Sequence, residues 1–383
     1  MKITGALVYG PDQTFGKRDI YIRDGRFAAE DGSSFTGGSD DEVFDASGCY
    51  AIPGLVDIHF HGCMGSDVCD GGYEDFEKIA QYELGRGVTA ICPATLTLPV
   101  EELEKVLTVG AEFAKEDRQD CSELVGFNME GPFISKVKKG AQNEDYILPC
   151  DAEIVDRFCK ASKGLVKIIG IAPECNPGYE EYIRAVRDKV TVSLAHTAAG
   201  YDDAAGAIKA GACHAVHLYN AMTGMDHRNP GVVGAVFDSS DVTAELICDN
   251  IHIHPAVVRN TFRILGRDRM ILISDSMRAT GMPDGEYDLG GLLVDKKGRE
   301  CRLKGGGAIA GSGSDLMDCL TIAVKEMDIP LESAVAAATI NPAKRIGIDD
   351  MHGEIAPGKY GDVVLLSQDT LEIKAVFKRG RRI

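Results

Sequence analysis

The sequence lacks any apolar run long enough to span a bilayer. Its first residues, MKITGALVYGPDQTF, also lack the charged-then-apolar pattern and the small-residue cleavage site of a secretory signal. Low-complexity tracts and self-similar repeats of about 20 to 50 residues are absent too, which argues against a repeat array. We therefore expect a cytoplasmic globular protein with no membrane partner.

Positive charge is scarce. The chain has 41 Lys and Arg against 59 Asp and Glu, and its formal net charge is −18 at pH 7. Such a charge argues against nucleic acid and anionic membranes as partners. A small anionic ligand is still allowed, because nearby donors can outweigh a distant field.

CxxC pairs are absent although the chain has twelve cysteines. The cysteines are scattered along a long chain, and Cys92, Cys213 and Cys248 lie within apolar, strand-like runs. A disulfide scaffold is therefore disfavoured, and we expect free, mostly buried thiols in a reducing compartment.

Apolar, β-branched runs alternate with segments of helical period through the middle of the chain. Eight strands are expected, at 51–61, 87–96, 122–131, 165–174, 190–197, 212–220, 242–250 and 268–276. Six helices are expected between them, at 73–87, 99–116, 151–162, 179–189, 201–211 and 254–266. The strands read as continuous apolar runs, which is typical of parallel strands covered on both faces.

This alternation predicts an α/β fold, a (β/α)8 TIM-type barrel over residues 52–354. The two ends of the chain instead read as short strands and turns. We expect residues 1–51 and 355–383 to form a small β domain, a β-sandwich built from both termini. Two late helices are expected at 315–327 and 331–347, the second ending in Asn-Pro.

The stretch IPGLVDIHFHG, residues 52–62, places His59 and His61 one residue apart at the end of a predicted strand. Residues i and i+2 of a strand point to the same face, so both imidazoles should project the same way. A metal ion requires that arrangement, although a hydrogen-bonded histidine pair is an alternative.

Further polar residues end other predicted strands. The full set of strand-end residues is His59, His61, Glu130, His196, His217 and Asp275. A single such histidine is usually a hydrogen-bonded structural residue, and a single carboxylate often caps the next helix. All of them should meet at one rim, because a barrel gathers the carboxyl ends of its strands there. Three other histidines lack this pattern and are expected to be structural: His214, His254 and His352.

Four imidazoles and two carboxylates suit a divalent transition metal such as Zn or Fe. Six groups exceed one tetrahedral site, so one or two ions are expected, with Glu130 as the candidate bridge. A metal ion lowers the pKa of bound water to about 7 and polarises carbonyl groups. This set of residues therefore indicates hydrolysis of an amide or a related bond.

The order HxH, acidic residue, His, His, Asp resembles the amidohydrolase superfamily. Within it, five motifs resemble the N-acetylglucosamine-6-phosphate deacetylases: MEGPFIS (129–135), HLYNAM (217–222), HRNPG (227–231), CDNIHIHP (248–255) and ISDSM (273–277). The tail GEIAPGKYGDVVLL resembles the return into that superfamily's β domain. The resemblance implies release of acetate from a phosphorylated amino sugar.

The resemblance also implies roles for the strand-end residues. Glu130, His196 and His217 match the main metal site of the family. His59 and His61 match the extra ligands of its two-metal members, and Asp275 matches the catalytic acid and base.

Four residues match positions around the sugar phosphate: Asn220, the backbone at Ala221, Arg228 and His252. The last two are thought to reach across a dimer interface in that family, so a homodimer is implied. For Arg228 a surface ion pair is the alternative.

One position departs from the family. KKGAQN has Gln142 where a histidine that helps to hold the substrate carbonyl is expected. A Gln amide can donate a hydrogen bond in its place, but it does not carry charge. Simple tolerance of the change is the alternative.

Other functions stay open from the sequence. They are deacetylation of the galactosamine epimer, a cyclic amidase or another deacylase, and a non-enzymatic scaffold. The glycine-rich stretch at 305–315 lacks the GK[ST] ending of a phosphate loop, and we expect a flexible loop over the barrel mouth instead.

Overall fold

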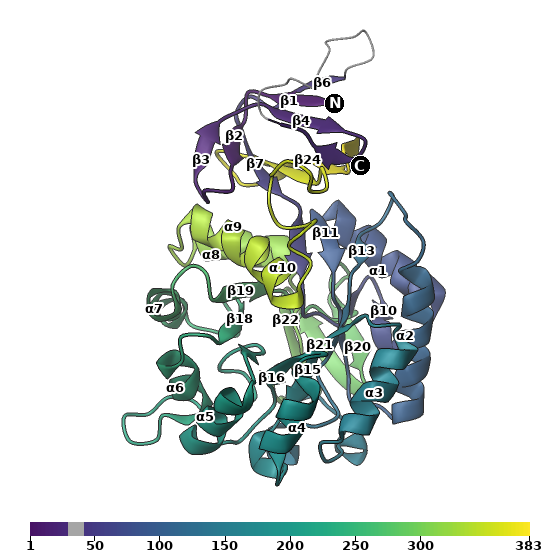
Figure 1. The fold of residues 1–383 in the computed structure, drawn as a ribbon, viewed down its shortest axis with the longest axis vertical. Coiled ribbons are helices and arrows are strands. Elements are labelled where there is room, and N and C mark those ends of the chain that lie inside the picture. The colour runs from purple at the N-terminus through teal and green to yellow at the C-terminus, as the bar shows by residue number, and fades with distance from the viewer. Residues whose placement is uncertain (30–41) are drawn as a thin grey trace.

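The computed structural model describes residues 1–29 and 42–383. The stretch of the expected terminal β domain at 30–41 lies outside the described residues. Both ends of the chain meet in one β region at the top of Figure 1, above a larger α/β body. None of the helices in the described ranges combines the length and the apolar character that a bilayer crossing requires.

The terminal β region consists of two sheets. The larger has the order β25-β24-β23-β7-β2-β3, with bounds Arg381–Arg382, Ile373–Lys378, Val363–Ser367, Cys49–Pro53, Leu7–Tyr9 and Phe15–Lys17. The smaller has the order β5-β4-β1-β6, with bounds Arg26–Phe27, Ile20–Arg23, Lys2–Thr4 and Val43–Asp45. Antiparallel pairing of β7 with β23 joins the two chain ends, and Ile3, Ile22 and Phe377 share one apolar core between them.

The body is a curled β layer of two sheets, with orders β13-β11-β8 and β12-β14-β15-β16-β17-β18-β19, and every pairing between neighbouring strands is parallel. Its strands, in chain order, are β8 (Leu55–Asp57), β11 (Val88–Ile91), β12 (Ala94–Thr95), β13 (Glu123–Leu124), β14 (Phe127–Met129), β15 (Val166–Ile171), β16 (Thr191–Leu194), β17 (His214–Ala215), β18 (Thr243–Ile247) and β19 (Met270–Ile273). Backbone hydrogen bonds from Asp275 to His59 (2.9 Å) and from His61 to Ser276 (2.7 Å) join the segments that follow β19 and β8. The β layer is therefore barrel-like.

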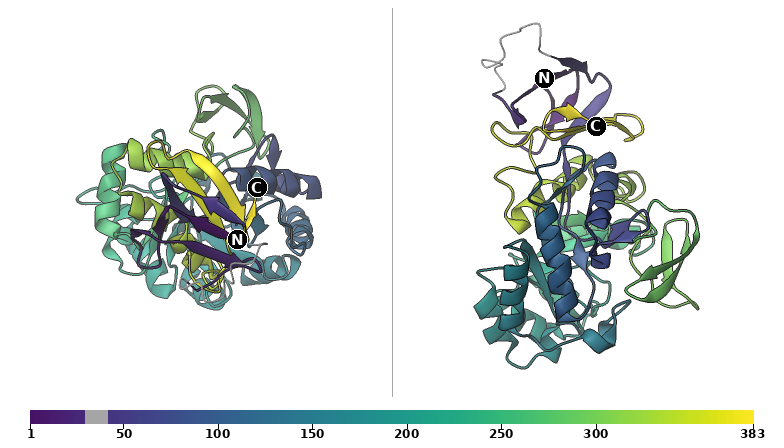
Figure 2. Two further views of the ribbon diagram at one scale, coloured as in Figure 1. Left: turned by 90° about the horizontal axis from the view of Figure 1, so that it is seen from above. Right: turned by 90° about the vertical axis from the view of Figure 1, so that its right-hand side faces the viewer.

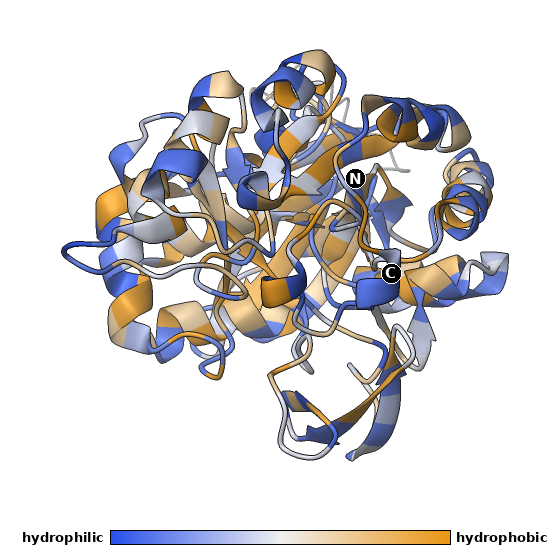
Figure 3. Cartoon of the chain, turned by 90° about the horizontal axis from the view of Figure 1, so that it is seen from below, coloured by the Kyte–Doolittle hydropathy of each residue, from blue (hydrophilic) through white to orange (hydrophobic). Residues whose placement is uncertain are grey.

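Helices cover the outside of this β layer (Figures 1 and 2). They are α1 (Tyr73–Gly85), α2 (Val100–Phe113), α3 (Ala152–Ala161), α4 (Tyr179–Val186), α5 (Tyr201–Ala210), α6 (Gly231–Asp238) and α7 (Pro255–Leu265). Six match predicted helices, whereas α6 was not predicted. Its sequence GVVGAVFD is apolar on nearly all sides and buried along most of its length, so it shows no helical period. The central strands are mostly hydrophobic and the outward helix faces more polar (Figure 3).

The predicted strand at 51–61 is wrong as a single element. It divides at Gly54 into β7, in the terminal sheet, and β8, in the barrel. A Cβ atom at Gly54 would lie 2.1 Å from Oγ1 of Thr89, so only glycine fits this crossing. His59 and His61 lie beyond the end of β8 rather than within a strand.

Three late helices follow in the chain: α8 (Leu316–Lys325), α9 (Leu331–Ala338) and α10 (Ile340–Ile346). The predicted single helix at 331–347 is wrong, because Thr339 (φ −134°, ψ −85°) breaks it into α9 and α10. Asn341 and Pro342 lie inside the first turn of α10 instead of ending a helix. Proline is tolerated there because an amide hydrogen has no partner in a first helical turn.

A three-stranded antiparallel sheet was not predicted. Its strands are β20 (Gly285–Leu289), β21 (Leu292–Lys297) and β22 (Glu300–Leu303). It stands away from the barrel on one side, in green on the right of Figure 2. The chain that follows, at 308–311, lines the site described below, in agreement with the expected position at the barrel mouth.

Candidate active site

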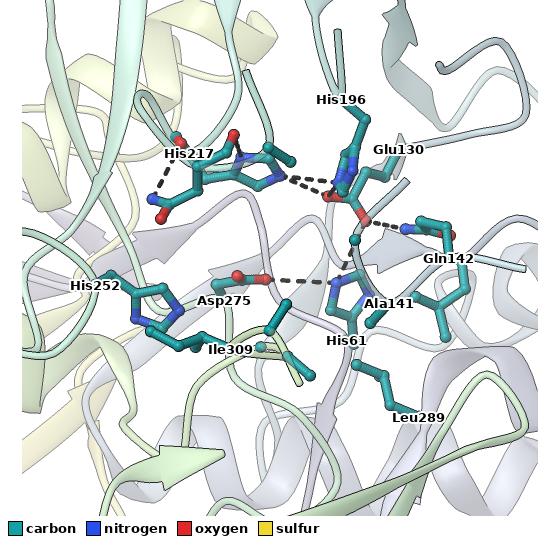
Figure 4. A pocket seen from close by; sticks show the side chains of 17 residues that line it. His61, Glu130, Ala141, Gln142, His196, His217, His252, Asp275, Leu289 and Ile309 are labelled. Atoms are coloured by element: carbon teal, nitrogen blue, oxygen red, sulfur yellow. Dashed lines mark hydrogen bonds and ion pairs between the residues drawn. The ribbon is translucent and has the colours of Figure 1, made fainter. Parts of the chain in front are cut away.

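The strand-end residues converge although they are far apart in the chain. Each lies just beyond the carboxyl end of its strand, after β8, β14, β16, β17 or β19. They enclose one space at that rim of the barrel, as Figure 4 shows for the labelled side chains. The convergence predicted from the sequence is confirmed by the distances that follow.

Glu130 lies at the centre of the first group. Its Oε1 is 2.9 Å from Nε2 of His196 and 2.8 Å from Nε2 of His217. The two Nε2 atoms are 3.2 Å apart. Ligand atoms about 2.0–2.1 Å from a tetrahedral zinc ion lie about 3.3 Å from each other, so these separations suit one coordination shell.

The outer nitrogen atoms of both rings are engaged by carbonyl oxygens. His196 Nδ1 is 2.8 Å from the carbonyl of Lys138, and His217 Nδ1 is 3.2 Å from that of Asn220. A carbonyl only accepts, so each Nδ1 donates. Each Nε2 then either donates a proton to Glu130 or, without that proton, presents a lone pair that a bound cation can accept in its place.

His59 and His61 repeat this arrangement on the other side of Glu130. Nδ1 of His59 donates to Glu245 (2.7 Å) and Nδ1 of His61 to the carbonyl of Ala94 (3.1 Å). Nε2 of His59 makes no hydrogen bond within the described structure and lies 3.3 Å from Oε1 of Glu130. Nε2 of His61 lies 3.5 Å from Oε2 of the same carboxylate. These residues therefore fit a second cation bridged by Glu130.

Asp275 completes the group. Its Oδ1 lies 3.4 Å from Nε2 of His61 and 3.8 Å from Nε2 of His59. Burial alone would raise its pKa, but the hydrogen bond with His61 and the neighbouring imidazoles hold the pKa below its ordinary value. Asp275 is therefore an ionised carboxylate that can accept a proton.

The same balance governs Glu130. Burial opposes its charge, yet His196, with the hydrogen bonds from His196 and His217, holds its pKa well below the ordinary value. In return, neighbouring carboxylates raise the pKa of the histidines against burial: Glu245 and Glu130 act on His59, Asp275 and Glu130 on His61, and Glu130 on His196. Protons and a metal ion thus compete for the same nitrogen atoms.

These side chains open onto a cavity of about 260 Å³. Polar groups on its wall include Gln142, Asn220 and His252. Another part of the wall is apolar and is formed by Leu96, Ala141, Leu289, Ile309 and Ala310.

The model of the amidohydrolase family matches residues 50–383. The chain belongs to the amidohydrolase family. It is 35% identical over 321 residues to the N-acetylglucosamine-6-phosphate deacetylase of Bacillus subtilis, covering 83% of this chain and 81% of that protein. It is 31% identical over 329 residues to the N-acetylgalactosamine-6-phosphate deacetylase of Escherichia coli O157:H7, covering 86% of each.

A solved structure has the same architecture over the whole chain. It is a mutant of the N-acetyl-D-glucosamine-6-phosphate deacetylase of Mycobacterium smegmatis in complex with N-acetyl-D-glucosamine-6-phosphate. The TM-score is 0.91 at 29% identity, and the match covers 100% of this amidohydrolase and 98% of that chain.

Gln142 lies at the site, but its amide is already engaged. Nε2 donates to Oε2 of Glu130 (2.5 Å), and Oε1 accepts a hydrogen bond from the backbone of Thr97 (2.6 Å). One amide hydrogen of Nε2 is not used by these two bonds. Gln142 thus holds the central carboxylate of this amidohydrolase in addition to any contact with substrate.

The residues expected around the sugar phosphate do not all meet. Asn220, Ala221 and His252 line the cavity of their own chain. A reach of His252 across a dimer interface stays a prediction. Asp249, just after β18, holds the His252 ring at 2.7 Å on this rim. Arg228 lies in an exposed loop beside a separate hollow of about 650 Å³, where it contacts His227.

Sequence reasoning missed Glu245. This residue is fully buried within β18 and accepts hydrogen bonds from His59, His214 (2.8 Å) and the backbone of His217 (3.0 Å). The available signal was a lone carboxylate inside the apolar run VTAELIC. His214 is thereby a structural partner of Glu245, as expected, rather than a member of the cluster.

The other histidines expected to be structural, and the cysteines, agree with the predictions from the sequence. His254 caps the start of α7, and His352 is buried near Glu123 and Tyr360, so both are structural as expected. All twelve cysteines fall in the described ranges and are free, which confirms the expected absence of a disulfide scaffold.

Proposed function

We propose that this amidohydrolase hydrolyses the acetamido group of N-acetyl-D-glucosamine 6-phosphate, producing D-glucosamine 6-phosphate and acetate in amino-sugar catabolism. The observation that carries the proposal is the convergence of the strand-end residues on Glu130. Relatives and solved structures that bear this enzyme's name support the choice of substrate.

One or two divalent ions are required, Zn or Fe by the donor set. Glu130, His196 and His217 would hold the first ion, and His59 and His61 with Glu130 would hold the second. A bound ion supplies an activated water molecule and polarises the amide carbonyl.

Asp275 is the acid and base of the reaction. Its ionised carboxylate accepts a proton from the attacking water and later delivers it to the leaving amine nitrogen. The amide C–N bond breaks, and water supplies the hydroxyl of acetate and the hydrogen of the amine. Gln142 supports this step in two ways, by holding Glu130 in place and by offering its second amide hydrogen to the substrate.

Asn220, the backbone at Ala221 and His252 bind the sugar and its phosphate. Arg228 provides a planar set of donors for phosphate, and it serves the site of a second subunit in a homodimer. Arg228 lines a separate hollow and not the cavity of its own chain, which favours this arrangement. Light scattering should give twice the mass of one chain.

We further propose the domain organisation expected from the sequence. Residues 52–354 form a (β/α)8 barrel, and residues 1–51 with 355–383 form a β-sandwich. A cytoplasmic location and the absence of a nucleic-acid partner stay predictions from composition.

A second candidate substrate is N-acetylgalactosamine 6-phosphate, because a deacetylase of that sugar is among the similar proteins. The two sugars differ in the orientation of one hydroxyl group. A cyclic amidase or another deacylase, and a non-enzymatic scaffold, are disfavoured by the named relatives and by the complete donor set.

The test is acetate release from a panel of N-acetylated amino sugars, with and without the 6-phosphate, by protein reconstituted with Zn or Fe. We expect the phosphorylated glucosamine derivative to be hydrolysed fastest and chelated protein to be inactive. Equal activity after thorough chelation, or on unphosphorylated sugars, would overturn the proposal.

A further inference from the structure

We propose that four residues of the apolar wall of the site cavity, Leu96, Ala141, Leu289 and Ala310, receive the acyl group of the substrate, and that Leu289 limits its length. This inference rests on the proposed function and deepens it. It names the part of the site that selects among N-acyl groups.

The apolar wall is a single packed unit. Leu96, Leu289 and Ala310 are 3%, 2% and 1% exposed and belong to one hydrophobic cluster, with Ala141 packed against it. All four line the same cavity as Glu130. Close packing of this kind resists displacement, so the space beside the wall has a defined size.

The antiparallel sheet β20–β22 supplies Leu289 to the wall. Leu289 ends β20, and Gly290 after it has φ +59° in the turn to β21. A Cβ atom at Gly290 would lie 3.0 Å from Cδ1 of Leu96. The turn is therefore pressed against Leu96, which fixes how far Leu289 extends along the cavity.

The opposite side of the cavity is polar. His252 lies to one side of Asp275 in Figure 4, whereas Ala141 and Leu289 lie to the other. An amide carries two substituents that leave the carbonyl group in different directions, the amine on nitrogen and the alkyl group on carbon. With the scissile carbonyl beside Asp275, the sugar phosphate and the acyl group must therefore occupy different sides.

The chemistry of the substrate indicates which of its parts occupies the polar side of the cavity and which the apolar side. The hydroxyl and phosphate groups of the sugar need hydrogen-bonding partners when they are buried, and the apolar wall offers none. The amide of Gln142 is held by Glu130 and Thr97, and its one remaining hydrogen serves the amide group of the substrate in the proposed reaction rather than the sugar. The alkyl part of the acyl group is the apolar end of the substrate, so it is the part that suits this wall.

The experiment measures kcat/KM for the N-formyl, N-acetyl, N-propionyl and N-butyryl derivatives of glucosamine 6-phosphate with the metal-loaded protein. Leu289→Ala should raise the ratio of propionyl to acetyl substrate at least about tenfold, because one methylene in an apolar pocket changes specificity by roughly 10–200-fold. The control is Leu293→Ala on the same sheet, where the leucine is 47% exposed. It should leave the ratio unchanged.

A second variant tests the opposite direction. Ala141→Val narrows the same space and should raise the ratio of formyl to acetyl substrate. A fold defect would lower kcat/KM for all four substrates together and would leave both ratios unchanged. Equal losses on every acyl group, or a change only in the preference for phosphorylated sugars, would overturn the inference.

The same assays distinguish failure of this inference from failure of the proposed function. If the unaltered protein releases no acid from any N-acylated hexosamine 6-phosphate, the proposed function fails. If it deacetylates normally but both variants keep its acyl ratios, only the role of the apolar wall fails.

Discussion

Nδ1 of His59 donates a hydrogen bond of 2.7 Å to Oε2 of Glu245, and both side chains are fully buried. This bond turns Nε2 of His59 toward Glu130 at 3.3 Å. A carboxylate behind a histidine in this way fixes the tautomer and orientation of the ring for metal binding.

Glu245→Gln should therefore weaken binding of the second metal ion by about 10- to 100-fold, the usual effect of losing such a partner. Binding at Glu130, His196 and His217 should persist. Metal titration with elemental analysis measures both stoichiometries. The matched control is Glu372→Gln, at an exposed carboxylate in the terminal β region. Unchanged affinity for both ions would contradict the role of Glu245.

Asp275→Asn should lower kcat by about 10²- to 10⁴-fold, the range for loss of a general acid or base. An amide has nearly the shape of the carboxylate but does not accept the proton of the attacking water. Metal content at the Glu130 group should stay close to that of the unaltered protein, which separates a chemical defect from metal loss. Turnover near the original value would remove Asp275 from the reaction.

Arg228→Ala should reduce kcat/KM for phosphorylated substrates much more than for unphosphorylated ones. Because Arg228 is exposed and lies outside the cavity of its own chain, we expect its effect in a dimer only. An equal loss on both substrate types would show that Arg228 is not the phosphate anchor.

Mixing two impaired variants tests whether Arg228 acts on the site of its own subunit or on that of its neighbour. Hybrid dimers of Arg228→Ala with Asp275→Asn contain one site with neither defect if Arg228 acts across the interface. Subunit exchange should then restore activity, whereas no recovery in verified hybrids would assign Arg228 to its own chain or to the surface.

Glu83 gives a prediction about stability. Its side chain is fully buried in α1, neither carboxylate oxygen has a hydrogen-bond partner within the described structure, and burial raises its pKa well above the ordinary value. The folded protein therefore keeps a proton that the unfolded chain releases above about pH 4.3. Stability should fall by up to about 1.4 kcal/mol for each further pH unit until the folded-state pKa is reached.

Glu83→Gln removes this dependence because an amide does not ionise. The variant should gain stability over the original protein that is larger at pH 8 than at pH 5. Urea unfolding at both values, with excess metal throughout, measures the difference. Glu74→Gln, exposed in the same helix, is the control and should show no such trend.

Much of the barrel could be predicted from the local sequence. Every predicted barrel strand has a counterpart in the structure, because parallel strands covered on both faces are recognisable as continuous apolar runs. Helix α6 was not predicted because it is apolar on nearly all sides and shows no helical period. The division between β7 and β8 was not predicted because both strands are apolar and adjacent in the chain. Which sheet each joins depends on partners far away in the chain.

By itself, the sequence determined the identity of the donors and their place at strand ends, from which a barrel topology brings His59, Glu130 and Asp275 to one rim. Only the tertiary structure decided that Glu245 backs His59, that Gln142 holds Glu130, and that Leu289 closes one side of the cavity. It also separated Arg228 from the site of its own chain. The reason is physical: strand-end position follows from local periodicity, whereas hydrogen-bond partners and cavity walls depend on how separate segments of the chain pack against one another.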